Sequence, residues 1–315
     1  MAVAFNKLVT PTSDDYTVET PHTKIAIGLG VFGIVIAMAV LVIALVAAND
    51  LEGGNAPQLL AYAFGLQTTA LVTIKVAIAA ALVGILVRLW LRIESVKESL
   101  GVLQPSDHGS GPSLGDVHTD FGDATVTKGV PETLPIHKMA RTMWFPMVAM
   151  GPMFVVAGLV TSIVWGNNVG TETGVAASGW TQGLQFLGEG LVLAGISFLL
   201  GSILASLREG GADVQKALGL NVITLKMPAT AKAFVVLMAT GLMISMVQFG
   251  LYIYTVTGLN ADSFAEIAPW WAWMGPLREL GLALLLAGIV LALATIANVL
   301  GFQFSRIRSI AATGE

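Results

Sequence analysis

Residues 25–48, IAIGLGVFGIVIAMAVLVIALVAA, form an apolar stretch without a single charged side chain. A helix needs about 20 such residues to cross the hydrocarbon core of a bilayer. These stretches are apolar on all sides, whereas the strands of a membrane β-barrel alternate apolar and polar residues over about ten positions. The sequence therefore predicts an all-α integral membrane protein with six transmembrane helices, the other five near residues 64–91, 143–166, 183–207, 231–256 and 276–303.

The composition of the chain agrees with a membrane location. Of its 315 residues, 55% are apolar and only 11% are charged, and the mean hydropathy is +0.78. Soluble domains carry about a quarter charged residues. Cysteine is absent, which excludes disulfides and thiolate metal sites. The net charge of −4 gives no reason to expect a nucleic-acid partner.

Lysine and arginine lie almost entirely on one side of the predicted helices. The connections at 49–63, 167–182 and 257–275 contain neither residue. Because positively charged loops stay on the cytoplasmic side, both termini are expected in the cytoplasm of a bacterial-type inner membrane. The same rule predicts cytoplasmic segments at residues 1–24, 100–136, 208–227 and 304–315.

The chain shows weak internal symmetry that suggests three parallel helical-hairpin repeats, at residues 25–99, 137–207 and 228–303. A proline followed by a lysine precedes the first helix of each repeat, and chance recurrence in apolar helices is the alternative explanation. The second helix of each hairpin is expected to extend past the inner face of the bilayer, with a break at Gly210–Gly211 in the second hairpin. The Gly/Pro/Asp-rich segment 100–136 has the composition of a flexible linker, which a partner could order. The proline–lysine pairs are Pro21/Lys24, Pro135/Lys138 and Pro228/Lys232.

Four charged residues fall within or at the edge of the apolar stretches, where charge is costly and often functional. A fixed helical rise places Lys75, Glu189, Arg278 and Glu279 in the outer half of the bilayer. A Lys75–Glu189 contact is expected, with Arg278 as the rival partner of Glu189. The cluster could bind an ion or small solute, or it could fix helix packing and hold another subunit. Three glutamines could support the first role, namely Gln67, Gln185 and Gln248.

Methionines form a stripe on one face of the third predicted helix. Thioethers can hold Cu(I) without histidine or cysteine, but methionine also packs well in irregular helix contacts. Helix five has a similar scatter of methionines, which favours packing. No histidine lies within a predicted helix, so no haem or other cofactor is expected. The stripe consists of Met139, Met143, Met147 and Met150.

These patterns favour a non-catalytic structural or accessory subunit of a larger membrane complex. Its expected partners are other membrane-protein subunits and lipids, and no catalytic constellation of residues points to an enzyme. The alternative is a transporter or channel for a small solute or ion at the Lys75/Glu189 cluster. A weaker alternative is a copper-handling membrane protein that uses the methionine stripe.

Overall fold

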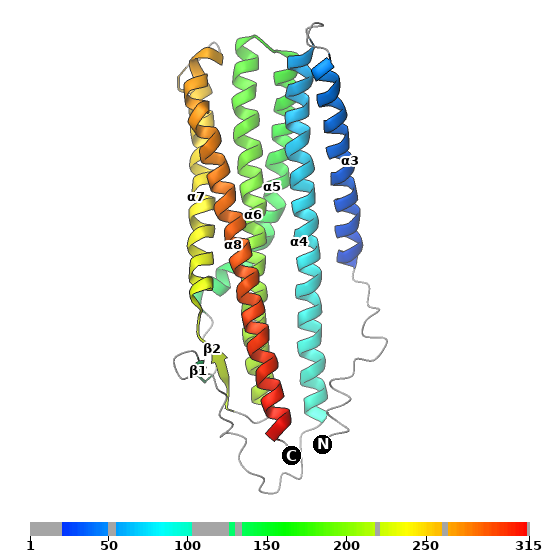
Figure 1. Cartoon of the computed structure of the whole chain (residues 1–315), viewed down its shortest axis with the longest axis vertical. Coiled ribbons are helices and arrows are strands. Elements are labelled where there is room, and N and C mark those ends of the chain that lie inside the picture. The colour runs from blue at the N-terminus through cyan, green and yellow to red at the C-terminus, as the bar shows by residue number, and fades with distance from the viewer. Residues whose placement is uncertain are drawn as a thin grey trace.

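Figure 1 shows the computed structural model of the chain, which is described for residues 21–49, 55–102, 126–129, 134–217, 221–259 and 264–313. In these ranges the chain forms six long helices, each long and apolar enough to cross a membrane, which confirms the prediction of six such helices in an all-α chain. Most of the predicted linker, including His108 and His118, lies outside the described residues. The helices are α3 (Pro21–Asn49), α4 (Ala56–Val102), α5 (Pro135–Asn167), α6 (Glu172–Ala217), α7 (Ala229–Thr257) and α8 (Phe264–Thr313).

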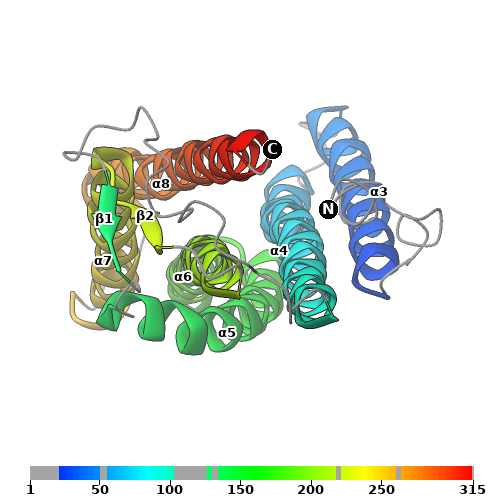
Figure 2. The same ribbon diagram turned by 90° about the horizontal axis from the view of Figure 1, so that it is seen from below.

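Helix α6 lies at the centre of the bundle. Viewed along the helices in Figure 2, it is surrounded by α4, α5, α7 and α8, while α3 lies at the rim against α4. Of the residues in the most apolar stretch of α6, 89% are buried, against 11% in α3. The outer helices therefore supply the apolar surface that would face lipid, and α6 supplies the core.

Glycines let the neighbouring helices approach α6 closely. A methyl group added at Gly151 of α5 would lie 2.4 Å from Cγ2 of Val192 on α6, and one at Gly188 would lie 2.5 Å from the carbonyl oxygen of Gly151. Helices in lipid associate through such close packing because burial of apolar surface gives little gain there. The small residues of α5 and α6 thus set the distance between these two helices.

The second helix of each hairpin is much longer than a bilayer requires, with 47 residues in α4, 46 in α6 and 50 in α8. At the lower end in Figure 1 these helices extend well past the level at which α3 begins, and an extension at one end was expected. At the upper end they also begin 8 to 12 residues earlier than the apolar stretches predict. A small core of Val175, Ile267 and Trp271 packs there. It stabilises helical turns at the start of α6 and α8 that the hydropathy of the sequence does not predict.

The predicted break at Gly210–Gly211 is wrong, because α6 continues through both glycines to Ala217. Gly210 is buried, and a methyl group at Gly211 would lie 2.5 Å from Nε2 of Gln303 on α8. Gly211 therefore allows α8 to pack closely against α6.

A two-stranded sheet at the lower end was not expected. Strand β1 (Val126–Lys128) pairs antiparallel with β2 (Ile223–Leu225), so two connections far apart in the sequence lie side by side. Gln215 at the end of α6 fixes β2: its Nε2 donates to the carbonyl oxygen of Ile223 at 3.0 Å, and its Oε1 accepts from the amide of Ile223 at 2.9 Å.

Candidate functional site

Glu189 occupies the middle of α6, and its side chain is only 4% exposed. The flanking glycines direct it, because Gly188 contacts α5 and Gly190 lies against Ser245 of α7. Successive helical residues are rotated by about 100°. The carboxylate is therefore left to face the remaining side of α6, between α4 and α8.

Two cations meet at this carboxylate. The Lys75 ammonium on α4 donates to Oε1 of Glu189, so the contact expected between these residues is present. Arg278 on α8, expected as a rival, also contacts Glu189, with Nη2 at 3.4 Å from Oε2. Because a carboxylate has two oxygens, each cation takes one of them. This ion cluster, defined as Lys75, Glu189 and Arg278, joins α4, α6 and α8.

Aromatic rings hold the Arg278 guanidinium in place. Its central carbon lies 6.0 Å from the ring centroid of Phe64 and 5.6 Å from that of Phe186, within the range of cation–π attraction. Its Nε is buried without a hydrogen-bond partner. Neither phenylalanine stands out in the sequence, since ring contacts of this kind depend on which helices become neighbours.

The ion cluster lies deep in the bundle relative to the tryptophans of the upper end. Phe64 packs edge-on against Trp165, with ring centroids 6.1 Å apart. Lys75 follows Phe64 by eleven residues, or about 16 Å of helix, and Glu189 follows Trp180 by nine residues, or about 13 Å. If these tryptophans mark the interface of a core about 30 Å thick, the cluster lies near its middle.

The other residues of the predicted site are divided between the interior and the surface. Gln185 is fully buried one turn before Glu189, and its Nε2 donates to the carbonyl oxygen of Gly65 at 3.2 Å. Gln248 is fully buried on α7 and donates to a carbonyl of α8. Gln67 and Glu279 are exposed. The two buried glutamines therefore connect helices, and Glu279 stays outside the ion cluster.

The methionine stripe does not gather around one point. Met139, Met143 and Met150 are 43%, 39% and 46% exposed on the outside of α5, whereas Met147 packs against the core. The stripe extends over about 16 Å of helix, too far for its four thioethers to share one ion. Within the described residues, no group of three His, Asp or Glu side chains could hold a metal either.

A cavity of about 100 Å³ lies at the lower end, between α5, α6, α7, α8 and β2. None of the residues that line it belongs to the ion cluster. The sequence did not predict this cavity, because its walls come from four helices and a strand.

The chain matches no protein-family model, and no curated protein or solved structure is significantly similar to it.

Proposed function

We propose that the protein is a non-catalytic structural or accessory subunit of a larger membrane complex. The observation that supports this proposal is the ion cluster, in which Lys75 on α4 and Arg278 on α8 both contact Glu189 on α6. A solute-binding site would need charged groups that face an accessible cavity. Here the charges instead connect helices, as expected of groups that fix a packing arrangement.

The charge balance of the ion cluster favours a partner. Two cations share one carboxylate, so the cluster has a formal excess of one positive charge near the middle of the bundle. Such a charge is costly in hydrocarbon. Both cationic side chains are 17% exposed and so can be reached from outside the bundle. A carboxylate from a neighbouring subunit at the α4–α8 side would neutralise the excess.

Purification from native membranes in a gentle detergent, followed by identification of the proteins that travel with the chain, tests this proposal. We expect membrane-protein partners in fixed proportion. The Lys75→Met variant, which removes the excess charge, should lose them, while Lys232→Gln, which removes an exposed lysine on α7, should keep them. A wild-type chain that purifies alone would contradict the proposal.

A second candidate is a transporter or channel for a small solute or ion at the ion cluster, and the excess positive charge favours an anion. Flux of chloride into liposomes that contain the purified chain would support it. Loss of that flux in Lys75→Met, with the protein still assembled in the membrane, would favour transport over a structural role.

We also propose three parallel hairpin repeats and a bacterial-type inner membrane with both termini in the cytoplasm. The start of each hairpin supports the repeats, because α3 begins at Pro21, α5 begins at Pro135 and α7 follows Pro228 directly. Since the chain has no cysteine, single cysteines can report the orientation. An impermeant maleimide added to intact cells should label Val169→Cys at the upper end but not Lys232→Cys at the lower end.

A further inference from the structure

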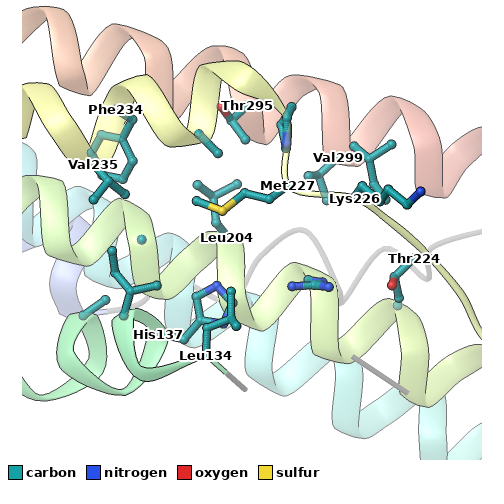
Figure 3. A pocket seen from close by; sticks show the side chains of 18 of the residues that line it. Leu134, His137, Leu204, Thr224, Lys226, Met227, Phe234, Val235, Thr295 and Val299 are labelled. Atoms are coloured by element: carbon teal, nitrogen blue, oxygen red, sulfur yellow. The ribbon is translucent and has the colours of Figure 1, made fainter. Parts of the chain in front are cut away.

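The cavity at the lower end has an apolar interior. Figure 3 shows side chains from α5, α6, α7 and α8 around it, together with the segment that leads from β2 into α7. The apolar residues that line it include Phe198, Leu204, Phe234, Met238, Val299 and Phe302. A wall of this kind accepts hydrocarbon and rejects a fully hydrated ion.

The charged side chains that line the cavity are all basic. Arg208 and Lys226 are the charged lining residues, and no Asp or Glu is among the lining residues. In Figure 3 the Lys226 amine points away from the apolar side chains of Leu204 and Met227. Cationic groups next to an apolar interior complement a molecule with an anionic head and an apolar tail.

Two buried donors at the cavity have no hydrogen-bond partner in the protein. Nε of Arg208 and Oγ1 of Thr224 are both inaccessible to solvent and unpaired, and Thr224 as a whole is 4% exposed. A buried polar atom without a partner is unfavourable. Both residues line the cavity, and each group can donate a hydrogen bond to an anionic oxygen there.

The level of the cavity matches a lipid headgroup. Arg208 follows Trp180 by 28 residues, or about 42 Å of helix, close to the ~40–45 Å thickness of a bilayer with both headgroup regions, so Arg208 lies in the lower headgroup region if Trp180 lies in the upper one. Met238 lies six residues, or about 9 Å, further along α7 than the exposed Lys232, toward the bilayer interior. The polar atoms thus lie at headgroup depth and the apolar wall at acyl-chain depth.

We propose that this cavity binds one anionic phospholipid of the lower leaflet. Its phosphate accepts hydrogen bonds from Arg208 and Thr224, Lys226 adds a second positive charge, and the start of an acyl chain lies against Phe234 and Met238. Charge-assisted hydrogen bonds of this kind are the strong ones. The site is separate from the ion cluster, so it stands whether or not the protein is a subunit of a complex.

Native mass spectrometry of the full chain in detergent micelles tests the proposal. Phosphatidylglycerol is the probe, and phosphatidylcholine with the same acyl chains and inorganic phosphate are the comparisons. We expect one tightly held phosphatidylglycerol that phosphatidylcholine does not replace. Arg208→Gln should weaken its binding about tenfold, the size expected for losing a hydrogen bond to a charged group. Thr224→Val should weaken it a few-fold, and the control Lys232→Gln should not change it.

Three results would overturn the proposal. Equal retention of phosphatidylglycerol and phosphatidylcholine would show that the headgroup charge does not determine binding. Full displacement of the lipid by inorganic phosphate would show that the site binds a free anion. Unchanged binding in Thr224→Val would show that the hydroxyl does not contact the headgroup. Because Thr224→Val keeps the shape of the side chain, it decides the question even if Arg208→Gln fails to fold.

Discussion

Replacing Glu189 by glutamine should destabilise the bundle more than any other change in the ion cluster. The variant keeps the shape of the side chain but leaves Lys75 and Arg278 facing each other without an anion. The Glu189 side chain is only 4% exposed, so water does not reach the position where the negative charge is lost. Removal of one partner from a buried ion pair costs roughly 3–5 kcal/mol, and we expect the free energy of unfolding to fall by about this amount.

Lys75→Met should have a much smaller effect, because it leaves one carboxylate with one cation. The loss of a single polar contact between membrane helices averages about 0.6 kcal/mol, and we expect a decrease of about 1 kcal/mol. The double variant Lys75→Met/Glu189→Gln should be less destabilised than the sum of the two single variants, since only Arg278 then lacks a partner.

Titration with sodium dodecyl sulfate in mixed micelles, followed by tryptophan fluorescence, measures these differences. Glu209→Gln is the matched control, because Glu209 pairs with Arg141 in an ion pair whose side chains are 32% and 38% exposed. Exposed pairs contribute at most about 1 kcal/mol. Equal losses for Glu189→Gln and Glu209→Gln, or a larger loss for Lys75→Met than for Glu189→Gln, would refute this account of the ion cluster.

Three further changes test the packing of the bundle. Gly151→Ala should lower the free energy of unfolding by about 1–3 kcal/mol through overpacking. Gly250→Ala is the control and should be neutral or slightly stabilising, because nothing lies within 4 Å of the added methyl group. Equal effects of the two changes in the same titration would contradict the close α5–α6 contact. Gln248→Leu removes a buried hydrogen bond between α7 and α8 and should cost about 1 kcal/mol, while an unchanged titration midpoint would argue against that bond. Gln215→Leu should speed hydrogen exchange at the amide of Ile223, and unchanged exchange would show that β2 is held by other contacts.

The Lys75–Glu189 contact could be predicted from the sequence because it depends on distance along helices. The rise per residue is fixed, and the charged ends of an apolar stretch mark its level in the bilayer. Counting from Arg88 and Arg208 therefore predicts both side chains in the same half of the bilayer, where they could meet. The convergence of Arg278 on the same carboxylate needed the packing of α8 on α6, which no local pattern encodes.

The helix ends and the lower cavity could not be predicted, since they depend on contacts between distant segments. Hydropathy detects only the continuously apolar part of a helix, so it misses the more polar upper turns of α6 and α8, where Val175 and Ile267 pack together. Glycine favours a helix break when it is exposed, but Gly211 lies against Gln303 and the helix continues. The donors of the cavity come from α6 and β2, whose approach is a property of the folded chain.

The central position of α6 has a consequence for how the protein is made. Ribosomes deliver helices to the membrane in chain order, so α4 arrives before α6, and α8 arrives last. If the helices enter the bilayer in that order, Lys75 is already present when Glu189 arrives, and it can serve as the counter-ion of the carboxylate. In the same order, Arg278 could reach the carboxylate only after α8 has arrived, so this contact would report that all the helices are in place.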